Sequence, residues 1–310
     1  MHILVVGSLN MDLVVRLPEL PRPGETRLGG TFATFPGGKG ANQAVAAARL
    51  GARVTLIGRV GQDAFGRQLL DSLAAEGIDQ THVSLDPVQP TGVALIQVDA
   101  RGENTIAVAS GANFALSEAH LRDAWSRIEP PDWLVMPLEM PIETVEAAAR
   151  LAEAAGVGVI LNPAPARPLP AELLRRVDVL VPNQHEAAIL AGRSGSSDQD
   201  IRNAAADLRT QGASGVIVTL GERGALILDR HASAPVIVPA YPVEAIDTTA
   251  AGDCFVGALA VALAEQRSLP DAAAFASAAA ALSVTHSGAQ PSMPTRQELA
   301  SFLAHLPPPT

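Results

Sequence analysis

The 310-residue sequence is poor in the side chains that build disulfides and metal centres. Its one cysteine, Cys254, excludes an internal disulfide and any cysteine-rich metal site. This usage fits a reducing compartment, so we expect a cytoplasmic location. The seven histidines are scattered and form no HxxxH or HExxH pair, so neither a catalytic zinc nor a histidine-based triad is expected.

Positive charge is scarce as well. The chain has 22 Lys and Arg against 32 Asp and Glu, which gives a formal net charge of −10 at pH 7. Nucleic acids and anionic membrane surfaces require a basic face, so neither is expected as a partner. No apolar run approaches the ~20 residues that span a bilayer. A small anion held by local dipoles remains compatible with this charge.

The residues that are abundant favour an α/β protein. Hydrophobic residues make up 48% of the chain and aromatic residues only 3%, as in globular proteins packed through small side chains. Buried strands are expected at 3–6, 54–57, 133–136, 157–161, 177–181 and 215–219. Helices are expected at 63–76, 117–127, 143–155, 200–211, 251–266 and 271–285. This alternation predicts a mostly parallel central sheet with helices on both faces, in three layers.

Two β-rich segments interrupt the alternation, at about 13–36 and 91–108. Proline or glycine cuts both segments, and both lie beside stretches expected to face a ligand. They could form one small sheet that acts as a lid, or they could decorate separate edges. The residues alone leave both possibilities open.

Polar residues follow several of the predicted strands. The carboxyl ends of parallel strands meet at one edge of a sheet, so these side chains could share a cleft. They are Asn10, Asp12, Glu139, Asn162, Asn183, Glu186, Thr219 and Gly221. Each of them alone also fits a helix cap or a turn. No GxGxxG follows the first strand, so a dinucleotide-binding fold of the usual kind lacks its main support.

A glycine-lysine loop at residues 37–43 opens a helix. It is not a Walker A motif, because Lys39 is followed by Gly40 rather than Ser or Thr, and Ala33 stands where the first glycine belongs. Its glycines let the backbone and Asn42 approach a small polar ligand, with Lys39 as a donor or charge clamp.

The most informative segment is Asp-Thr-Thr-Ala-Ala-Gly-Asp at residues 247–253, directly before an apolar run. Small residues leave N–H groups bare at a helix N-terminus, which attracts anions. An acid at Asp253 would repel a phosphate, unless it serves as the base that deprotonates the nucleophile attacking that phosphate. It also fits an ordinary acid of a first helical turn, and these residues alone do not decide between the two.

Together these motifs resemble the phosphofructokinase B (pfkB) family of carbohydrate kinases over nearly the whole chain. The glycine-lysine loop with residues 7–12 upstream, and residues 247–253, match the two family signatures. Ala250-Ala251, where many relatives have Gly-Ala, and the stretches 162–167 and 288–292 resemble the members that phosphorylate ribose.

The resemblance implies site residues position by position. The sugar site would consist of Asn10, Asp12, Gly38, Lys39, Asn42 and Glu139. The nucleotide site would consist of Asn183, Thr219, Gly221, Glu222, Arg223, Gly224, Gly252 and Ser277, with Ser277 where some relatives have a histidine. Glu186 completes an Asn-x-x-Glu element that governs phosphate and magnesium binding. A monovalent-cation site, largely of backbone carbonyls, would involve Asp247, Thr249, Ser283, His286, Gly288 and Ser292.

The implied activity is phosphorylation of the 5-hydroxyl of D-ribose by ATP with Mg²⁺ or another divalent cation, and with K⁺ as an activator. Asp253 would be the general base, and the N–H groups of Ala250, Ala251 and Gly252 would stabilise the transferring phosphoryl group. The resemblance also implies a single domain over residues 1–310, a lid over the sugar from the two β-rich segments, and a homodimer formed through that lid.

Three other functions remain open. A kinase of the same family could act on 2-deoxyribose, fructose or a nucleoside, since few sugar contacts would differ. A non-catalytic sugar or nucleotide sensor could keep the fold, although the intact Asp253 argues against it. A nicotinamide-dependent oxidoreductase is the most distant of the three.

Overall fold

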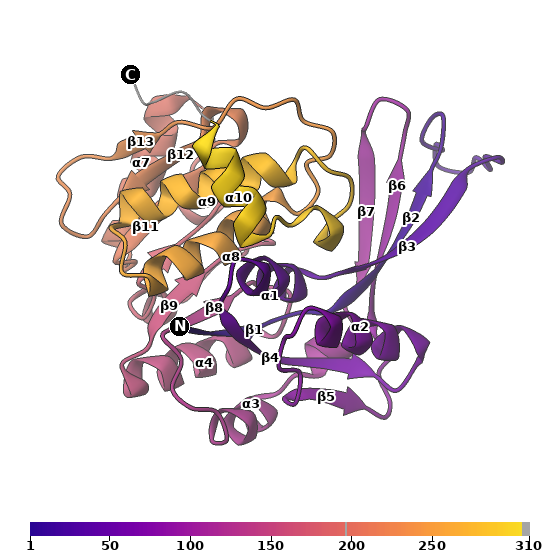
Figure 1. Ribbon diagram of the computed structural model, residues 1–310, viewed down its shortest axis with the longest axis horizontal. Coiled ribbons are helices and arrows are strands. Elements are labelled where there is room, and N and C mark those ends of the chain that lie inside the picture. The colour runs from indigo at the N-terminus through magenta and orange to yellow at the C-terminus, as the bar shows by residue number, and fades with distance from the viewer. Residues whose placement is uncertain (196, 306–310) are drawn as a thin grey trace.

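A computed structural model of the chain describes residues 1–195 and 197–305, and its centre is a nine-stranded sheet (Figure 1). The strands are β1 (His2–Val6), β4 (Arg53–Gly61), β5 (Val83–Asp86), β8 (Trp133–Met136), β9 (Gly158–Leu161), β10 (Val179–Leu180), β11 (Gly215–Thr219), β12 (Ala225–Leu228) and β13 (Val236–Val238). Their order is β13-β12-β11-β10-β9-β8-β1-β4-β5. Pairing is parallel from β5 to β11 and antiparallel only at β11–β12 and β12–β13, which confirms the predicted sheet.

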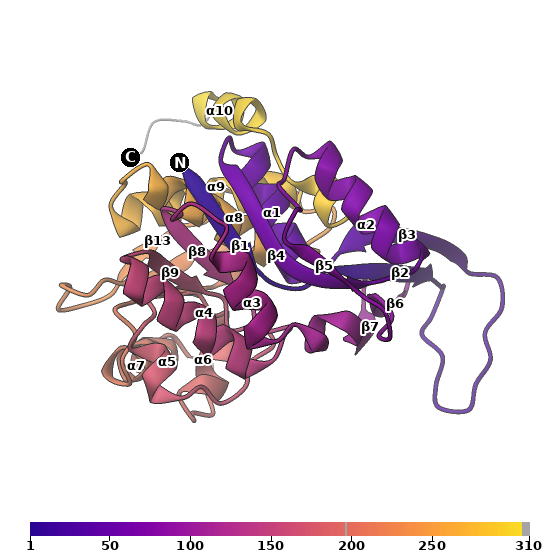
Figure 2. The same cartoon turned by 90° about the horizontal axis from the view of Figure 1, so that it is seen from below.

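Helices cover both faces of this sheet, so the body has three layers (Figure 2). One face carries α1 (Lys39–Arg49), α2 (Ala64–Ala75), α8 (Ala251–Ala264), α9 (Leu269–Ser283) and α10 (Arg296–Ala304). The other carries α3 (Glu118–Trp125), α4 (Ile142–Ala155), α5 (Ala171–Leu174), α6 (Gln184–Leu190) and α7 (Asp198–Thr210). Side chains of each strand alternate between the faces, so Val5 packs in one buried cluster and Leu4 in the other.

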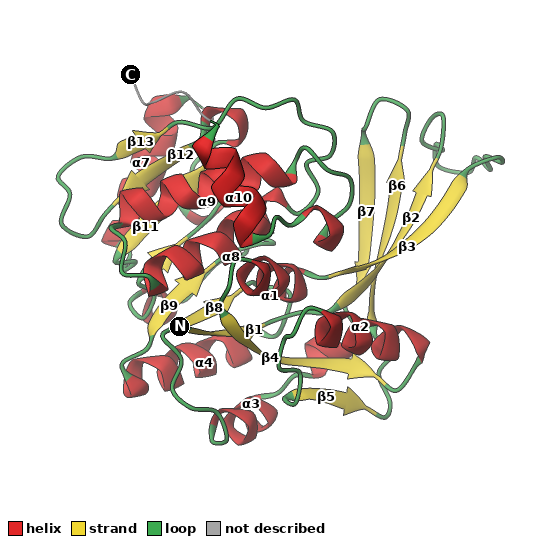
Figure 3. Cartoon of the chain, viewed as in Figure 1, coloured by secondary structure: helices red, strands yellow, loops and turns green. Residues whose placement is uncertain are grey.

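A second sheet of four strands stands apart from the helices (Figure 3). It consists of β2 (Asn10–Arg16), β3 (Thr31–Gly37), β6 (Gly92–Val98) and β7 (Asn104–Ala109), in the order β3-β2-β6-β7. β2 and β6 pair in parallel, and the two outer pairs are antiparallel. The two β-rich segments therefore build one small sheet and do not decorate separate edges, while the lid role of this sheet stays a prediction.

The structure places Asn10 and Asp12 differently from the prediction. They were expected just beyond the end of the first strand of the main sheet. Instead β1 ends at Val6, and both residues lie on β2, where Asn10 pairs with Gly37 and Gly92. Glycine is needed at Gly37, because a Cβ there would overlap the Asp12 carboxylate.

Within residues 1–195 and 197–305, no helix combines the length and the apolar character that crossing a bilayer requires.

Candidate active site

The N-terminus of α8 forms the centre of the site. Ala250, the residue before the helix, has a left-handed backbone with φ 59°, and its carbonyl accepts from the Cys254 N–H at 2.9 Å. The N–H groups of the following first turn have no partner within the helix. The Ala251 N–H donates to the Thr248 carbonyl outside the helix at 3.3 Å. Successive N–H groups at such a helix start can also hold an anion.

Asp253, in the same turn, is buried and held from another helix. Its side chain is only 6% exposed. Asn42 Nδ2 of α1 donates to Oδ2 at 3.0 Å, and Gln43 Nε2 donates to Oδ1 at 3.0 Å. The exposed first-turn acid Asp271 of α9 has no such environment. The catalytic role of Asp253 stays a prediction.

The predicted sugar-site groups gather around Glu139, which follows β8. Glu139 Oε2 accepts from Ser8 Oγ at 2.6 Å, from the Lys39 N–H at 3.1 Å and from Asn10 Nδ2 at 3.5 Å. Gly38 permits the close approach of the loop, since its φ is +88° and a Cβ would lie 2.6 Å from the Asn10 nitrogen. These contacts place the loop after β8 next to the first residues of β2 and of α1.

This place is rich in acids. Burial, together with the negative charges of Glu139 and Asp253, raises the pKa of Asp12 to about 7, against the opposing charge of Lys39. The pKa of the Lys39 ammonium is in turn raised, above all by Asp253 and despite its own burial. Carboxylates, amides and one ammonium are the mixture of donors and acceptors that recognises several hydroxyl groups.

A cavity of about 850 Å³ opens beside Gly252, at the N-terminus of α8. The residues that line it are Asn183, Gln184, His185, Ala188, Ile189, Arg193, Ser194, Gly195, Thr219, Gly221 and Gly252. Asn183, Thr219, Gly221 and Gly252 of the predicted nucleotide site are thus brought together. The remaining four predicted residues do not line this cavity.

The four predicted nucleotide-site residues outside this cavity are Glu222, Arg223, Gly224 and Ser277. Arg223 donates to Gln184 Oε1 at 2.6 Å, and Glu222 precedes it in the turn η2 (Gly221–Arg223). Gly224 has φ +94°, and a Cβ there would overlap the Val238 carbonyl. Ser277 is buried within α9. Their predicted role in nucleotide binding stays a prediction.

Asn183 and Glu186 form a capping box at the start of α6. Asn183 Oδ1 accepts from the Glu186 N–H at 2.9 Å, and Glu186 Oε2 accepts from the Asn183 N–H at 2.8 Å. Burial raises the pKa of the Glu186 carboxyl, against the hydrogen bond from Asn183. In the described part of the chain, no three His, Cys, Asp or Glu are grouped as a metal cage.

Asp247 joins the loops predicted to hold a monovalent cation. Its Oδ1 accepts from the Thr249 N–H at 2.9 Å, and its Oδ2 accepts from the Gly288 N–H at 2.9 Å. Burial alone would raise the pKa of this carboxyl, but these hydrogen bonds outweigh burial and lower it. The backbone of His286 donates to the Ser283 carbonyl at 3.0 Å, which keeps both residues in the same turn.

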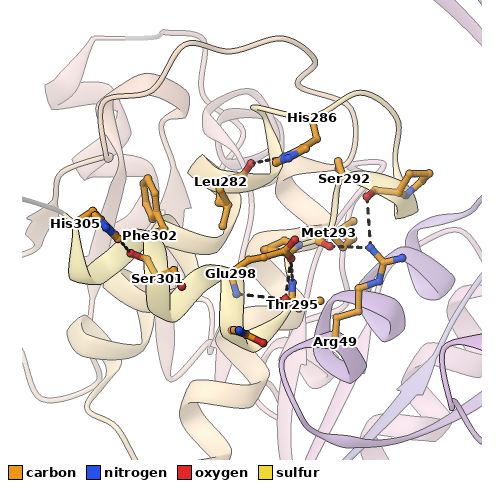
Figure 4. Close-up of a pocket in the computed structure, with 13 residues that line it drawn as sticks. Arg49, Leu282, His286, Ser292, Met293, Thr295, Glu298, Ser301, Phe302 and His305 are labelled. Carbon is orange, nitrogen blue, oxygen red and sulfur yellow. Dashed lines mark hydrogen bonds between the residues drawn. The ribbon is translucent and has the colours of Figure 1, made fainter.

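A second cavity, of about 740 Å³, lies behind these loops against α10 (Figure 4). His286 and Ser292 of the predicted cation site line it. Arg49, at the end of α1, reaches into the same region and donates to the carbonyls of Gln290 at 3.0 Å and Met293 at 2.7 Å. Arg49 therefore ties the helix that carries Asn42 to the loop that carries Ser292.

Several residues of the site were missed at the level of sequence. Gln43 was noted in the loop but not as a partner of Asp253, and Asn162 Oδ1 accepts from the same Gln43 Nε2 at 3.1 Å. Asn113 Nδ2 donates to Asn10 Oδ1 at 2.8 Å, and Arg193 and His185 line the cavity beside Gly252. Asn162 was visible as a polar residue after a strand, whereas Asn113 lies in no recognisable motif.

Comparison with known proteins agrees with this arrangement. Residues 1–296 match the pfkB family of carbohydrate kinases. The ribokinase of Haemophilus influenzae is 46% identical over 301 residues, covering 97% of this chain and 98% of that protein. The deoxyribokinase of Salmonella typhimurium is 38% identical over 305 residues, covering 98% and 99%.

The fold is also similar to that of solved structures. The structure of Arabidopsis thaliana ribokinase complexed with ribose and ATP superimposes with a TM-score of 0.89 at 34% identity, covering 97% of this chain and 98% of that one. Family match, sequence identity and fold all extend over nearly the whole chain, so this protein belongs to the pfkB family of carbohydrate kinases.

Proposed function

We propose that this chain is an ATP-dependent kinase that phosphorylates the 5-hydroxyl of D-ribose, giving D-ribose 5-phosphate and ADP. The observation that carries the proposal is the position of Asp253, which is buried at the N-terminus of α8, accepts a hydrogen bond from Asn42 and directly follows Gly252 of the cavity lining. The ribokinase of Haemophilus influenzae supports this choice of sugar.

In this proposal the sugar hydroxyls bind to Asn10, Asp12, Lys39, Asn42 and Glu139. Asn42 has a suitable free acceptor, since its Oδ1 is buried and has no hydrogen-bond partner among the described residues. A buried acceptor without a partner is costly, and a bound hydroxyl would remove that cost. A site built in this way rejects analogues that lack the hydroxyl.

Asp253 would take the proton of the 5-hydroxyl as that oxygen attacks the terminal phosphate of ATP. The N–H groups of Ala250, Ala251 and Gly252 would stabilise the charge of the transferring phosphoryl group. Positioning and electrostatics then account for most of the catalysis. The lid role of the small sheet, which would exclude water from the sugar, belongs to the same proposal.

Magnesium fits this site as a companion of the nucleotide. A Mg²⁺ ion is usually bound by one or two carboxylates together with substrate phosphates. Glu186, next to the cavity, can supply such a carboxylate directly or through water, and no protein cage is needed. When bound, the ion neutralises charge on the phosphates.

The turn around Asp247 also fits a monovalent cation such as K⁺. The Asp247 carboxylate already holds two N–H groups, so the ligands would be mainly backbone carbonyls of residues 247–249 and 283–292. Its negative charge would favour the cation without direct contact.

We further propose a homodimer formed through the small sheet. One face of that sheet is a row of apolar side chains, with Val14, Ala33, Ile96 and Ile106 directly opposite one another. Ile106 is 57% exposed, and Val108 next to it on the same face is 48% exposed. Contiguous exposed apolar side chains mark an interaction surface. The cytoplasmic location stays a prediction.

The test is ADP release from ATP with D-ribose, 2-deoxyribose, fructose and a nucleoside, with and without potassium. Ribose should give the highest kcat/KM, and potassium should raise the rate. A preference for 2-deoxyribose would replace the proposed substrate by that of the Salmonella relative. No turnover with any sugar would favour the sensor function.

The base assignment has its own test, Asp253→Asn. We expect a drop in kcat of about 10²- to 10⁴-fold, the usual contribution of a general base, with both ligands still bound. The matched control is Asp271→Asn, because Asp271 occupies the same third position of helix α9 and is exposed. The control should keep full turnover. An Asp253→Asn variant as active as the control would refute the base.

A further inference from the structure

Gln43 and Asn162 form a relay that ends on the Asp253 carboxylate. Asn162 Nδ2 donates to the Val181 carbonyl at 2.9 Å, and Asn162 Oδ1 accepts from Gln43 Nε2 at 3.1 Å. The same Gln43 nitrogen donates to Asp253 Oδ1 at 3.0 Å. The relay therefore connects the backbone at the end of the main sheet with the carboxylate at the start of α8.

The direction of this relay is determined by chemistry. A carboxylate only accepts, so the Gln43 amide must turn its NH₂ group toward Asp253. The NH₂ group of Asn162 is occupied by the Val181 carbonyl, so the Asn162 oxygen faces Gln43 and accepts its second proton. If the Gln43 amide were flipped, its oxygen would face two other acceptors, Asp253 Oδ1 and Asn162 Oδ1.

This orientation has a cost that structural packing does not explain. Gln43 is 1% exposed, and its Oε1 is a buried acceptor without a partner in the described part of the chain. Buried acceptors without partners are rare in native proteins and call for a specific reason. Here the arrangement keeps the Gln43 donor on Asp253.

The two carboxylate oxygens also have separate donors. Gln43 binds Oδ1, and Asn42 binds Oδ2. A carboxylate fixed at both oxygens cannot rotate about its bond to Cβ, and free lone pairs remain on each oxygen for a substrate proton.

From this geometry we infer that Gln43 is a positioning residue for the phosphoryl-transfer step, and that Asn162 acts on Asp253 through Gln43. The inference rests on the proposed function, because it assumes that Asp253 is the base. It assigns Gln43 no contact with the sugar or the nucleotide. Its effect is to fix the orientation of the carboxylate.

The test is the Gln43→Met variant, which keeps the packing volume and removes the donor. We expect kcat to fall about 10- to 100-fold, as for the loss of one hydrogen bond to a charged group, with little change in KM for ribose. The loss should appear in kcat and not in KM, because the carboxylate loses the donor that orients it while the sugar contacts remain. A loss of stability alone would lower the Tm and leave kcat of the folded enzyme unchanged.

Two further variants complete the design. The Gln43→Glu variant keeps the shape of the side chain but can donate to Asp253 only while the new carboxyl is protonated. Its activity should therefore fall as the pH rises. A dependence of activity on pH equal to that of the wild type would overturn the inference. Asn162→Leu should give a smaller effect in the same direction, and the double variant with Gln43→Met should be no worse than Gln43→Met alone. Additive effects would refute the relay.

Controls separate this inference from the proposed function. Thr55→Val removes a buried hydrogen bond to His2, at the opposite end of the sheet, and should leave kcat unchanged. If Asp253→Asn remains active, the proposed base is wrong. If Asp253→Asn is inactive while Gln43→Met keeps the wild-type kcat, only the role of Gln43 is wrong.

Discussion

The close contact between α1 and α8 makes Gly257 a sensitive position for catalysis. Gly257 lies one helical turn after Asp253, on the same face of α8. A Cβ added there would lie 2.6 Å from both the Gln43 carbonyl oxygen and the Ala46 Cβ. Favourable carbon–carbon separations are about 3.5–4.0 Å, so Gly257→Ala must push the two helices apart by roughly 1 Å.

The effect on stability should be small. Overpacking costs about 1–3 kcal/mol, while alanine in place of glycine inside a helix recovers about 1 kcal/mol. The net loss is about 1 kcal/mol, or roughly 2 °C in Tm for a chain of this size. The effect on catalysis should be larger, because the two 3.0 Å hydrogen bonds to Asp253 cross the same helix contact. A shift of roughly 1 Å carries them beyond bonding distance.

We therefore expect kcat of Gly257→Ala to fall at least about 10-fold at saturating ribose and ATP, measured by ADP release. The control is Val145→Ala, on α4 in the buried cluster of the sheet face opposite to α1 and α8, where a cavity costs about 2 kcal/mol. Its Tm should fall at least as much, and its kcat at 25 °C should stay the same. Equal losses of kcat in both variants would refute the reasoning.

Two other predictions concern charge and assembly. Because the pKa of Asp12 is raised from its ordinary value to about 7, its contribution to stability is present at acidic pH and is lost as the pH rises toward 7. The Tm of Asp12→Asn relative to wild type should therefore increase between pH 5 and pH 8, while ribose affinity falls; a constant difference in Tm would contradict the shift. Ile106→Lys should give a monomer by light scattering, whereas Thr105→Lys, on the opposite face of β7, should remain a dimer. A dimeric Ile106→Lys variant would exclude this surface.

Much of the fold could be predicted because the local signal was strong. Continuous apolar runs identified 133–136 and 215–219 with the bounds of β8 and β11, and the six predicted helices are correct to within about two residues. The antiparallel strands β12 and β13 were not predicted. Their positions depend on pairing with β11 and with each other, and a short apolar run does not reveal its partner.

The site was predictable where its residues lie in contiguous motifs. Residues 37–43 and 247–253 could be recognised because their glycines and alanines serve local backbone needs. The contact between Gln43 and Asp253 joins positions 210 residues apart, and the contact between Asn113 and Asn10 joins positions 103 apart. No local pattern indicates which buried amide will reach which acid, because that depends on how α1 packs on α8 and on how the small sheet meets the body.

The strand β2 has a consequence for the speed of the proposed reaction. It carries Asn10 and Asp12, and it is also an inner strand of the small sheet, hydrogen-bonded on both sides. If the sheet swings away from the body, these two side chains leave the sugar together with it. Opening the lid and breaking contacts to the product then occur as one motion. Every additional hydrogen bond from β2 to the sugar would then slow product release.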